Sequence, residues 1–465
     1  MSRLIIAGGT IVTMDAARRI VSGDVVVEDG RIVEIVLSHK AYDANAQTRG
    51  ASAQRDDAAA PRHDATAQRI DASGCIVLPG LVQAHTHLCQ TLCRGAADDL
   101  PLLAWLRQRV WPYEAALDER AMRACARLAC AELLLGGTTA ILDMGTVHET
   151  DALFAAVAAT GLRATIGKAM MDAGDGVPPR LRDDTRRAVD ESDALAARWD
   201  GAADGRLRYA YAPRFVLSCS EELLREVGAR VHRGARLHTH ASEQEAEIEL
   251  VRRERGADNI VYLESLGLSG PRAALAHCVH ATDDERRRLA AGGTHVVHCP
   301  SSNLKLGSGI APIPEMLAQG IQVALGADGA PCNNNLDGFI ELRLAALLHK
   351  PRAGATAMPA ETVLALATRG GAAALGLEDR IGSLEVGKRA DLIVVEPRVP
   401  HAVPAFSPVS TLVYATQSRD VRDVVVDGRL LVRDGQLTAL SGLDVAEVVA
   451  TAQDEAARVQ ARVRA

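Results

Sequence analysis

Residues 76–87 read Ile76-Val77-Leu78-Pro79-Gly80-Leu81-Val82-Gln83-Ala84-His85-Thr86-His87, an apolar run that ends in two histidines. Side chains along a β-strand point alternately to its two faces, so His85 and His87 share one face. Two imidazoles on one face can bind the same metal ion without distortion of the backbone. The stretch therefore predicts a buried strand that delivers two ligands to a metal site.

Short apolar runs of the same kind recur through the middle of the chain. They lie at residues 138–142, 207–211, 235–240, 273–277, 295–298 and 322–328, with helical stretches such as 119–135 and 220–232 between them. Alternation of strands and helices favours parallel strands covered by helices. About eight such units in roughly 300 residues match a TIM-like (β/α)8 barrel better than an open sheet. We therefore expect an α/β protein whose barrel covers residues 76–381.

The two ends of the chain have a different texture. Short strands are predicted within residues 3–37 and again within 390–432, which suggests a small β-sandwich domain built from residues 1–75 and 382–443. Residues 38–70 contain almost no large apolar side chain and are expected to form a solvated insertion into that domain. Residues 444–465 are predicted to form a polar amphipathic helix.

Composition excludes several classes of function. The chain has 465 residues, 48% of them hydrophobic, and a net charge of −7, so it can bury a large core but offers no basic face to nucleic acid or an anionic membrane. No stretch reaches the roughly 18 apolar residues of a membrane span. The first residues are too weakly apolar for a signal peptide. We expect a cytoplasmic protein and a homo-oligomer, namely a dimer, because long barrels with exposed helices often pair.

Polar residues of the metal-binding and catalytic types follow the later apolar runs. His240 and Glu243 follow one run, and His277 and Asp328 follow two others. A barrel places its active site at these strand ends. Three imidazoles and a carboxylate, completed by water, form a suitable shell for catalytic zinc or iron. Each residue alone could be an ordinary buried polar group, but their shared placement favours a metal site.

Several stretches carry motifs that occur together in one enzyme family. They are residues 78–87, His240-Ala241-Ser242-Glu243, and residues 275–280, 298–304, 326–329 and 381–392. Together they resemble the amidohydrolase superfamily, in its branch of metal-dependent aminohydrolases that includes guanine deaminase, 5′-methylthioadenosine/S-adenosylhomocysteine deaminase and the s-triazine hydrolases. The resemblance covers nearly the whole chain except residues 38–70.

The resemblance implies one divalent metal ion, zinc first and iron as the alternative. Its implied ligands are His85, His87, His240 and Asp328. Glu243 is implied as the proton shuttle, His277 as the group that orients the attacking water, and Asp328 as an acceptor of that water's proton. No lysine stands at a bridging position, so a binuclear centre is not expected.

This set of residues suits hydrolytic displacement of an amino group from an electron-poor ring carbon. A bound divalent ion lowers the pKa of water from 15.7 toward about 7, and Glu243 can protonate the neighbouring ring nitrogen. The product is ammonia. As an alternative, Glu243 could cap the following helix, whose first residues are acidic.

Signals for the substrate divide between subfamilies. The residues Gln90, Arg214 and Phe215 resemble those that bind the base in guanine deaminase. An amide and a guanidinium can form hydrogen bonds to the lactam edge of the base, and an aromatic ring can pack on a purine. The stretch 94–106, which contains Trp105, looks more like the methylthioadenosine deaminases, and 306–316 is shared with the triazine enzymes. A loop salt bridge and a packed ring are the alternatives for Arg214 and Phe215.

The leading hypothesis is a deaminase for a small heterocyclic substrate. The substrate would be guanine or a 5′-deoxy- or 5′-methylthioadenosine-type nucleoside, bound by Gln90, Trp105, Arg214 and Phe215. An s-triazine chlorohydrolase or aminohydrolase is the alternative enzyme. A catalytically silent barrel is a remote alternative, since such proteins usually lose ligands and every expected ligand is present here.

Overall fold

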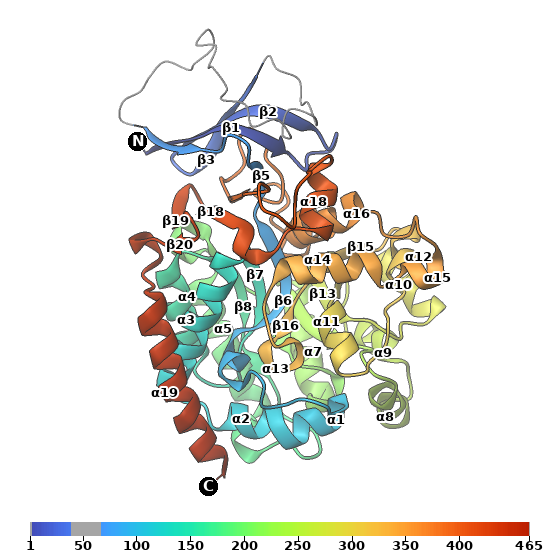
Figure 1. The fold of residues 1–465 in the computed structure, drawn as a ribbon. Helices are drawn as coiled ribbons and strands as arrows, with labels where there is room; N and C mark the ends of the chain where they lie inside the picture. The colour runs from blue at the N-terminus through green and yellow to red at the C-terminus, as the bar shows by residue number, and fades with distance from the viewer. Residues whose placement is uncertain (1, 39–66, 465) are drawn as a thin grey trace.

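The structure is a computed structural model that describes residues 2–38 and 67–464. Its strands fall into sheets of two kinds, an antiparallel-rich sheet at one end and parallel sheets through the body of the molecule (Figure 1). No helix in the described part of the chain is both long and apolar enough to cross a membrane. The expected α/β composition with parallel strands is confirmed.

The parallel strands form three hydrogen-bonded sets. One set runs β16 (Asp328–Gly329), β6 (Leu81–His87), β7 (Thr138–Met144), β8 (Arg163–Gly167) and β10 (Leu207–Tyr209). A second runs β12 (Leu237–Ala241), β13 (Ala273–His277), β14 (His295–His298) and β15 (Gln322–Leu325), and the third pairs β9 (Ala169–Met170) with β11 (Ala212–Pro213). A parallel bridge between Tyr211 and Leu237 connects the β10 side to β12.

Helices follow most of these strands. The longer ones are α3 (Glu119–Leu135), α4 (Thr150–Thr160), α5 (Thr185–Trp199), α7 (Glu221–His232), α8 (Glu245–Arg255), α10 (Asp283–Gly292), α14 (Gly338–Leu347) and α19 (Val445–Arg464). Helix α3 has the predicted bounds because Asp118 accepts the N–H of Ala121 at its start and Gly136 follows its end. Helix α19 lies along α3 on the outside of the molecule (Figure 1).

Strands from both chain ends form one nine-stranded sheet. Its members are β1 (Arg3–Val12), β2 (Ile20–Glu28), β3 (Arg31–Leu37), β4 (Gln68–Asp71), β5 (Ile76–Pro79), β17 (Leu392–Val395), β18 (Val421–Val426), β19 (Arg429–Arg433) and β20 (Gln436–Leu437). The join is the antiparallel pairing of β5 with β17, in which Leu392 faces Pro79. The ends of the chain are therefore held together by backbone hydrogen bonds.

Two expectations change at the edges of this sheet. The predicted single strand over 76–87 is two strands, because the chain passes from β5 in the nine-stranded sheet to β6 in the parallel set at Gly80. A Cβ at Gly80 would lie 2.1 Å from the side chain of Thr139, so the crossing is too close for any other residue. The expected insertion over 38–70 lies mostly outside the described residues, but its end forms β4 and pairs with β1.

A buried ion pair joins the nine-stranded sheet to the parallel strands. Arg163, at the start of β8, donates from Nε to Oδ2 of Asp391 over 2.6 Å and from Nη2 to Oδ1 over 2.9 Å. Both side chains are almost fully buried. Because Asp391 directly precedes β17, the pair fixes where that strand meets the parallel strands.

Candidate metal centre

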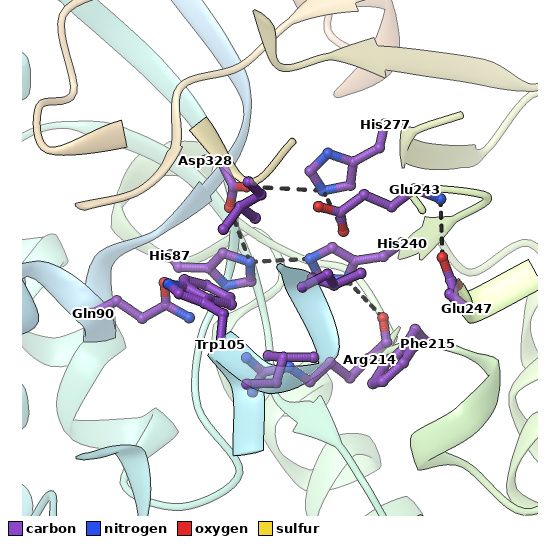
Figure 2. A pocket seen from close by; sticks show the side chains of 13 residues that line it. His87, Gln90, Trp105, Arg214, Phe215, His240, Glu243, Glu247, His277 and Asp328 are labelled. Atoms are coloured by element: carbon purple, nitrogen blue, oxygen red, sulfur yellow. Dashed lines mark hydrogen bonds and ion pairs between the residues drawn. The ribbon is translucent and has the colours of Figure 1, made fainter. Parts of the chain in front are cut away.

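The six residues expected to carry the chemistry lie together at the C-terminal ends of parallel strands, and Figure 2 shows five of them, all but His85. They are His85 and His87 in β6, His240 in β12, Glu243 just after β12, His277 at the end of β13 and Asp328 at the start of β16. All six are buried or nearly so. The backbones of His277 and Asp328 have positive φ values of 74° and 64°, a strained conformation that is typical of functional sites.

His87 and His240 present unprotonated nitrogens to each other. His87 Nδ1 donates to the carbonyl of Met144 over 2.8 Å, and His240 Nδ1 donates to the carbonyl of Arg214 over 2.7 Å. Burial lowers the pKa of His87 to about 3 and holds the pKa of His240 well below its usual range, so both rings are neutral. Their Nε2 atoms, 3.1 Å apart, therefore both carry lone pairs. A cation between them would remove that repulsion.

Asp328 and His85 complete this group of donors. Oδ1 of Asp328 lies 3.3 Å from His85 Nε2 and 3.4 Å from His87 Nε2. Burial acts to raise the pKa of Asp328, but the facing histidines hold that pKa well below its usual range, so the carboxylate is ionised. His85 Nε2 is buried without a hydrogen-bond partner. His85, His87 and His240 place ligand atoms close enough together to hold a divalent cation, and His85, His277 and Asp328 form a second such group that shares His85.

Glu243 and His277 form a second pair beside these donors. His277 Nε2 lies 3.5 Å from Oε2 of Glu243, and its Nδ1 bonds Oδ1 of Asn303 over 2.9 Å. Burial raises the pKa of Glu243 to about 7, against the opposing effect of His277. A carboxyl group with that pKa can both give and take a proton near neutrality.

The alternative role of Glu243 as a helix cap does not match its contacts. Gln244 is the N-cap residue of α8, and Glu247 accepts the backbone N–H of Glu243 through Oε2 over 2.9 Å. The carboxyl group of Glu243 instead faces His277 and lies 3.4 Å from the hydroxyl of Ser308. It is therefore free to take part in chemistry inside the pocket.

Three residues that contact the site were not predicted from the sequence to have a functional role. Ser302 donates to Oδ2 of Asp328 over 2.6 Å, and Asn303 holds His277. Both belong to the stretch 298–304 that carried the family resemblance, so a signal was present without a role attached. His238, for which the sequence indicated only a structural role, lies with Nε2 2.7 Å from His85 Nδ1.

The four predicted substrate-binding residues all line the same pocket as the metal-type ligands. Gln90 and Trp105 lie on the His87 side, and Arg214 and Phe215 lie below His240 (Figure 2). Glu247 and three apolar residues complete the lining; the apolar residues are Leu102, Leu106 and Leu306. The pocket thus combines a polar floor with apolar walls, as a site for a flat heterocycle requires.

Arg214 forms a salt bridge, which is the alternative role expected for it from the sequence. Its Nη1 and Nη2 lie 2.5 and 3.1 Å from the two carboxylate oxygens of Glu114, and Gln90 Nε2 donates to Glu114 Oε1 over 2.8 Å. Glu114 was not foreseen. The arginine therefore forms a buried salt bridge and lines the pocket at the same time.

Residues 76–431 match the sequence model of the amidohydrolase family. The chain belongs to this family. The protein is a hydrolase that acts on C–N bonds in cyclic amidines, and the resemblance noted from its motifs is confirmed.

Its relatives are named for adenosine-type substrates. The chain is 45% identical to a 5-methylthioadenosine/S-adenosylhomocysteine deaminase of Syntrophobacter fumaroxidans, over 81% of this chain and 84% of that protein. It is 40% identical to a 5′-deoxyadenosine deaminase of Methanosarcina acetivorans, over 98% of both chains. The crystal structure of an adenosine deaminase from Xanthomonas campestris with bound zinc is similar, with a TM-score of 0.87, 32% identity and 99% of each chain covered.

Proposed function

We propose that this protein is a metal-dependent deaminase of adenosine-type nucleosides, with 5′-deoxyadenosine or 5′-methylthioadenosine as substrate and ammonia as product. The observation that carries the proposal is the facing pair of unprotonated Nε2 atoms beside an ionised carboxylate, with a glutamate of raised pKa next to them. The names of the relatives support the nucleoside class.

The proposed ligands are His85, His87, His240 and Asp328, around one divalent ion. Zinc is the first candidate, and iron would accept the same nitrogen and oxygen donors. When bound, the metal ion would act as a Lewis acid and make hydroxide available near neutral pH. The backbone carbonyls of Met144 and Arg214 would keep two of the imidazoles in the tautomer that ligation needs.

The remaining chemistry belongs to side chains of this protein. Glu243 gives a proton to the ring nitrogen beside the reacting carbon, which makes that carbon more electrophilic. Asp328 accepts a proton from the attacking water, and His277, held by Asn303, orients the water oxygen through Nε2. A proton returned to the exocyclic nitrogen lets it leave as ammonia, so adenosine and water give the inosine analogue and ammonia.

We also propose that the chain forms a closed (β/α)8 barrel that ends near residue 381, and that the two chain ends together form a β-sandwich. The bridge between Tyr211 and Leu237 supports continuity around the parallel strands. The pairing of β5 with β17 in the nine-stranded sheet supports a barrel that begins after Gly80. A cytoplasmic homodimer is the expected assembly, and light scattering after gel filtration measures its mass.

A substrate panel on zinc-loaded protein tests the function. We expect ammonia from 5′-deoxyadenosine and 5′-methylthioadenosine, little from guanine, and no chloride from a chlorotriazine. Background ammonia from every nucleoside, with one zinc bound per chain, would refute the deaminase. The matched variant His240→Ala should lose both zinc and ammonia release, and His232→Ala, on the outer helix α7, should lose neither.

A further inference from the structure

A second pocket lies at the opposite ends of the same strands. Arg236 directly precedes β12 and Arg272 directly precedes β13, while the candidate metal ligand His240 lies near the C-terminal end of β12. The pocket has a volume of about 570 Å³. At 3.3 Å per residue, Arg236 and His240 are roughly 13 Å apart along the strand. The pocket is thus separate from the catalytic site and does not depend on the function proposed for it.

Three arginines line this pocket, and they differ in how their charges are balanced. Arg208 Nε donates to Oδ1 of Asp200 over 2.8 Å, and Arg272 Nη1 donates to the carbonyl of Gly234. Arg236 has no hydrogen bond or ion pair from its guanidinium to any residue within 2–38 and 67–464, although its Nη1 is buried. A buried guanidinium nitrogen without an acceptor is costly, so a partner from outside the chain is expected.

The backbone leaves room for two of these guanidinium groups. A Cβ at Gly376, where φ is 61°, would lie 1.2 Å from Arg236 Nη2. A Cβ at Gly234, where φ is 102°, would lie 2.9 Å from Arg272 Nη1. Both glycines are needed for their φ values and for the close approach of the arginines. The positions of Arg236 and Arg272 are therefore built into the fold.

The charge balance of the pocket favours an anion. Burial and the nearby Arg208 and Arg272 lower the pKa of Arg236, against the opposing charge of Glu378. Glu378 is exposed and forms no ion pair within the described residues, and Asp200 is already paired with Arg208. An anionic oxygen beside Arg236 would relieve this repulsion. The planar guanidinium fork matches the oxygens of phosphate in spacing and direction.

We propose that this pocket binds a phosphate group through Arg236 and Arg272. The phosphate is either inorganic or carried by a small ester, because the volume exceeds what one phosphate fills. Calorimetric titration of the zinc-loaded enzyme at constant ionic strength tests this, with inorganic phosphate and ribose 5-phosphate as the two probes. Arg236→Gln should weaken binding at least about tenfold, the loss expected for a charged hydrogen bond.

The control variant is Arg225→Gln, which removes an exposed arginine of α7 paired with Glu221. It should bind both probes like the wild type. Binding of both probes would indicate that the phosphate group suffices, and binding of ribose 5-phosphate alone would indicate an ester ligand. Saturable binding that is equal in wild type and Arg236→Gln, or no binding of either probe, would overturn the proposal. If Arg236→Gln does not fold, Arg272→Gln provides the same comparison.

Discussion

Glu243 lines the pocket of the candidate metal centre, whereas Glu114 contacts two of the lining residues, Gln90 and Arg214, and both glutamates are buried. Glu114 is held by two guanidinium nitrogens of Arg214 and by the amide of Gln90. Among the described residues, the carboxyl group of Glu243 has the ring of His277 at 3.5 Å and a long contact to the hydroxyl of Ser308. A carboxylate that is bound by a guanidinium and an amide serves to hold these neighbours in position. The one that lacks them keeps a pKa near 7 and can move a proton.

The largest effect on activity is expected when the carboxyl group of Glu243 is removed. Glu243→Gln should lower kcat for 5′-deoxyadenosine by about 100- to 10,000-fold, the usual contribution of a general acid. Zinc content and thermal stability should stay near the wild-type values, because the amide fills the same space without a buried charge. Steady-state kinetics and metal analysis measure both. Glu249→Gln, exposed on the following helix α8, is the control; a kcat for Glu243→Gln within tenfold of wild type contradicts the assignment.

At Glu114 the main expected loss is in stability. Glu114→Gln leaves the Arg214 guanidinium buried without a counter-charge, which should cost about 3 kcal/mol in the free energy of unfolding. Urea denaturation measures it. The double variant Glu114→Gln/Arg214→Met should recover part of the loss, because the stranded charge is gone. A cost below about 1 kcal/mol for the single variant would mean that the pair does not differ from an exposed salt bridge.

Glu341 is a third buried glutamate, whose hydrogen-bond partners are neutral, and it provides a case between Glu243 and Glu114. It accepts hydrogen bonds from Ser301 and Asn333, and burial raises its pKa to about 7. A raised pKa means that the folded protein binds this proton more tightly, so its stabilising effect is complete below pH 4.5 and is lost as the pH rises to about 7. Relative to Glu341→Gln, the wild type should lose up to about 1.4 kcal/mol per pH unit across that interval. Urea denaturation at pH 5, 6 and 7 measures the free energy of unfolding of both proteins. The same change with pH in the wild type and in Glu341→Gln would contradict the prediction.

The smallest effect is expected at Ser308. Its hydroxyl lies 3.4 Å from Oε1 of Glu243, which is long for a hydrogen bond. Ser308→Ala should therefore change kcat/KM by no more than about threefold, the equivalent of roughly 0.6 kcal/mol. Ser301→Ala, on the neighbouring helix but directed at Glu341, is the matched control. A loss above tenfold would show that Glu243 depends on this hydroxyl.

The clustering of the four candidate metal ligands could be predicted from the sequence because each of them follows a recognisable apolar run. The period of two along a strand pairs His85 with His87, and the strand ends of a repeated fold place His240 and Asp328 near them. Glu114 could not be predicted in the same way, because it is 100 residues from Arg214 in the chain and no short pattern connects the two.

The division of the strand at Gly80 was also hidden. The apolar run continues through it, since β5 and β6 are both buried although they belong to different sheets. Strand β4 was missed for the opposite reason. Three of its four residues are exposed, so it has the composition of a solvated segment, and only its pairing with β1 makes it a strand.

The pairing of β5 with β17 has a consequence for how the protein is made. During synthesis β1 and β5 leave the ribosome early, but the strand that covers the edge of β5 follows only after nearly all of the catalytic segment. Closure of such a distant contact is slow, and an unpaired strand edge invites association with other chains until it is covered. A chain truncated before Leu392 would keep every proposed metal ligand and still expose that edge. Nascent chains of this protein therefore depend on protection of β5 until translation is nearly finished.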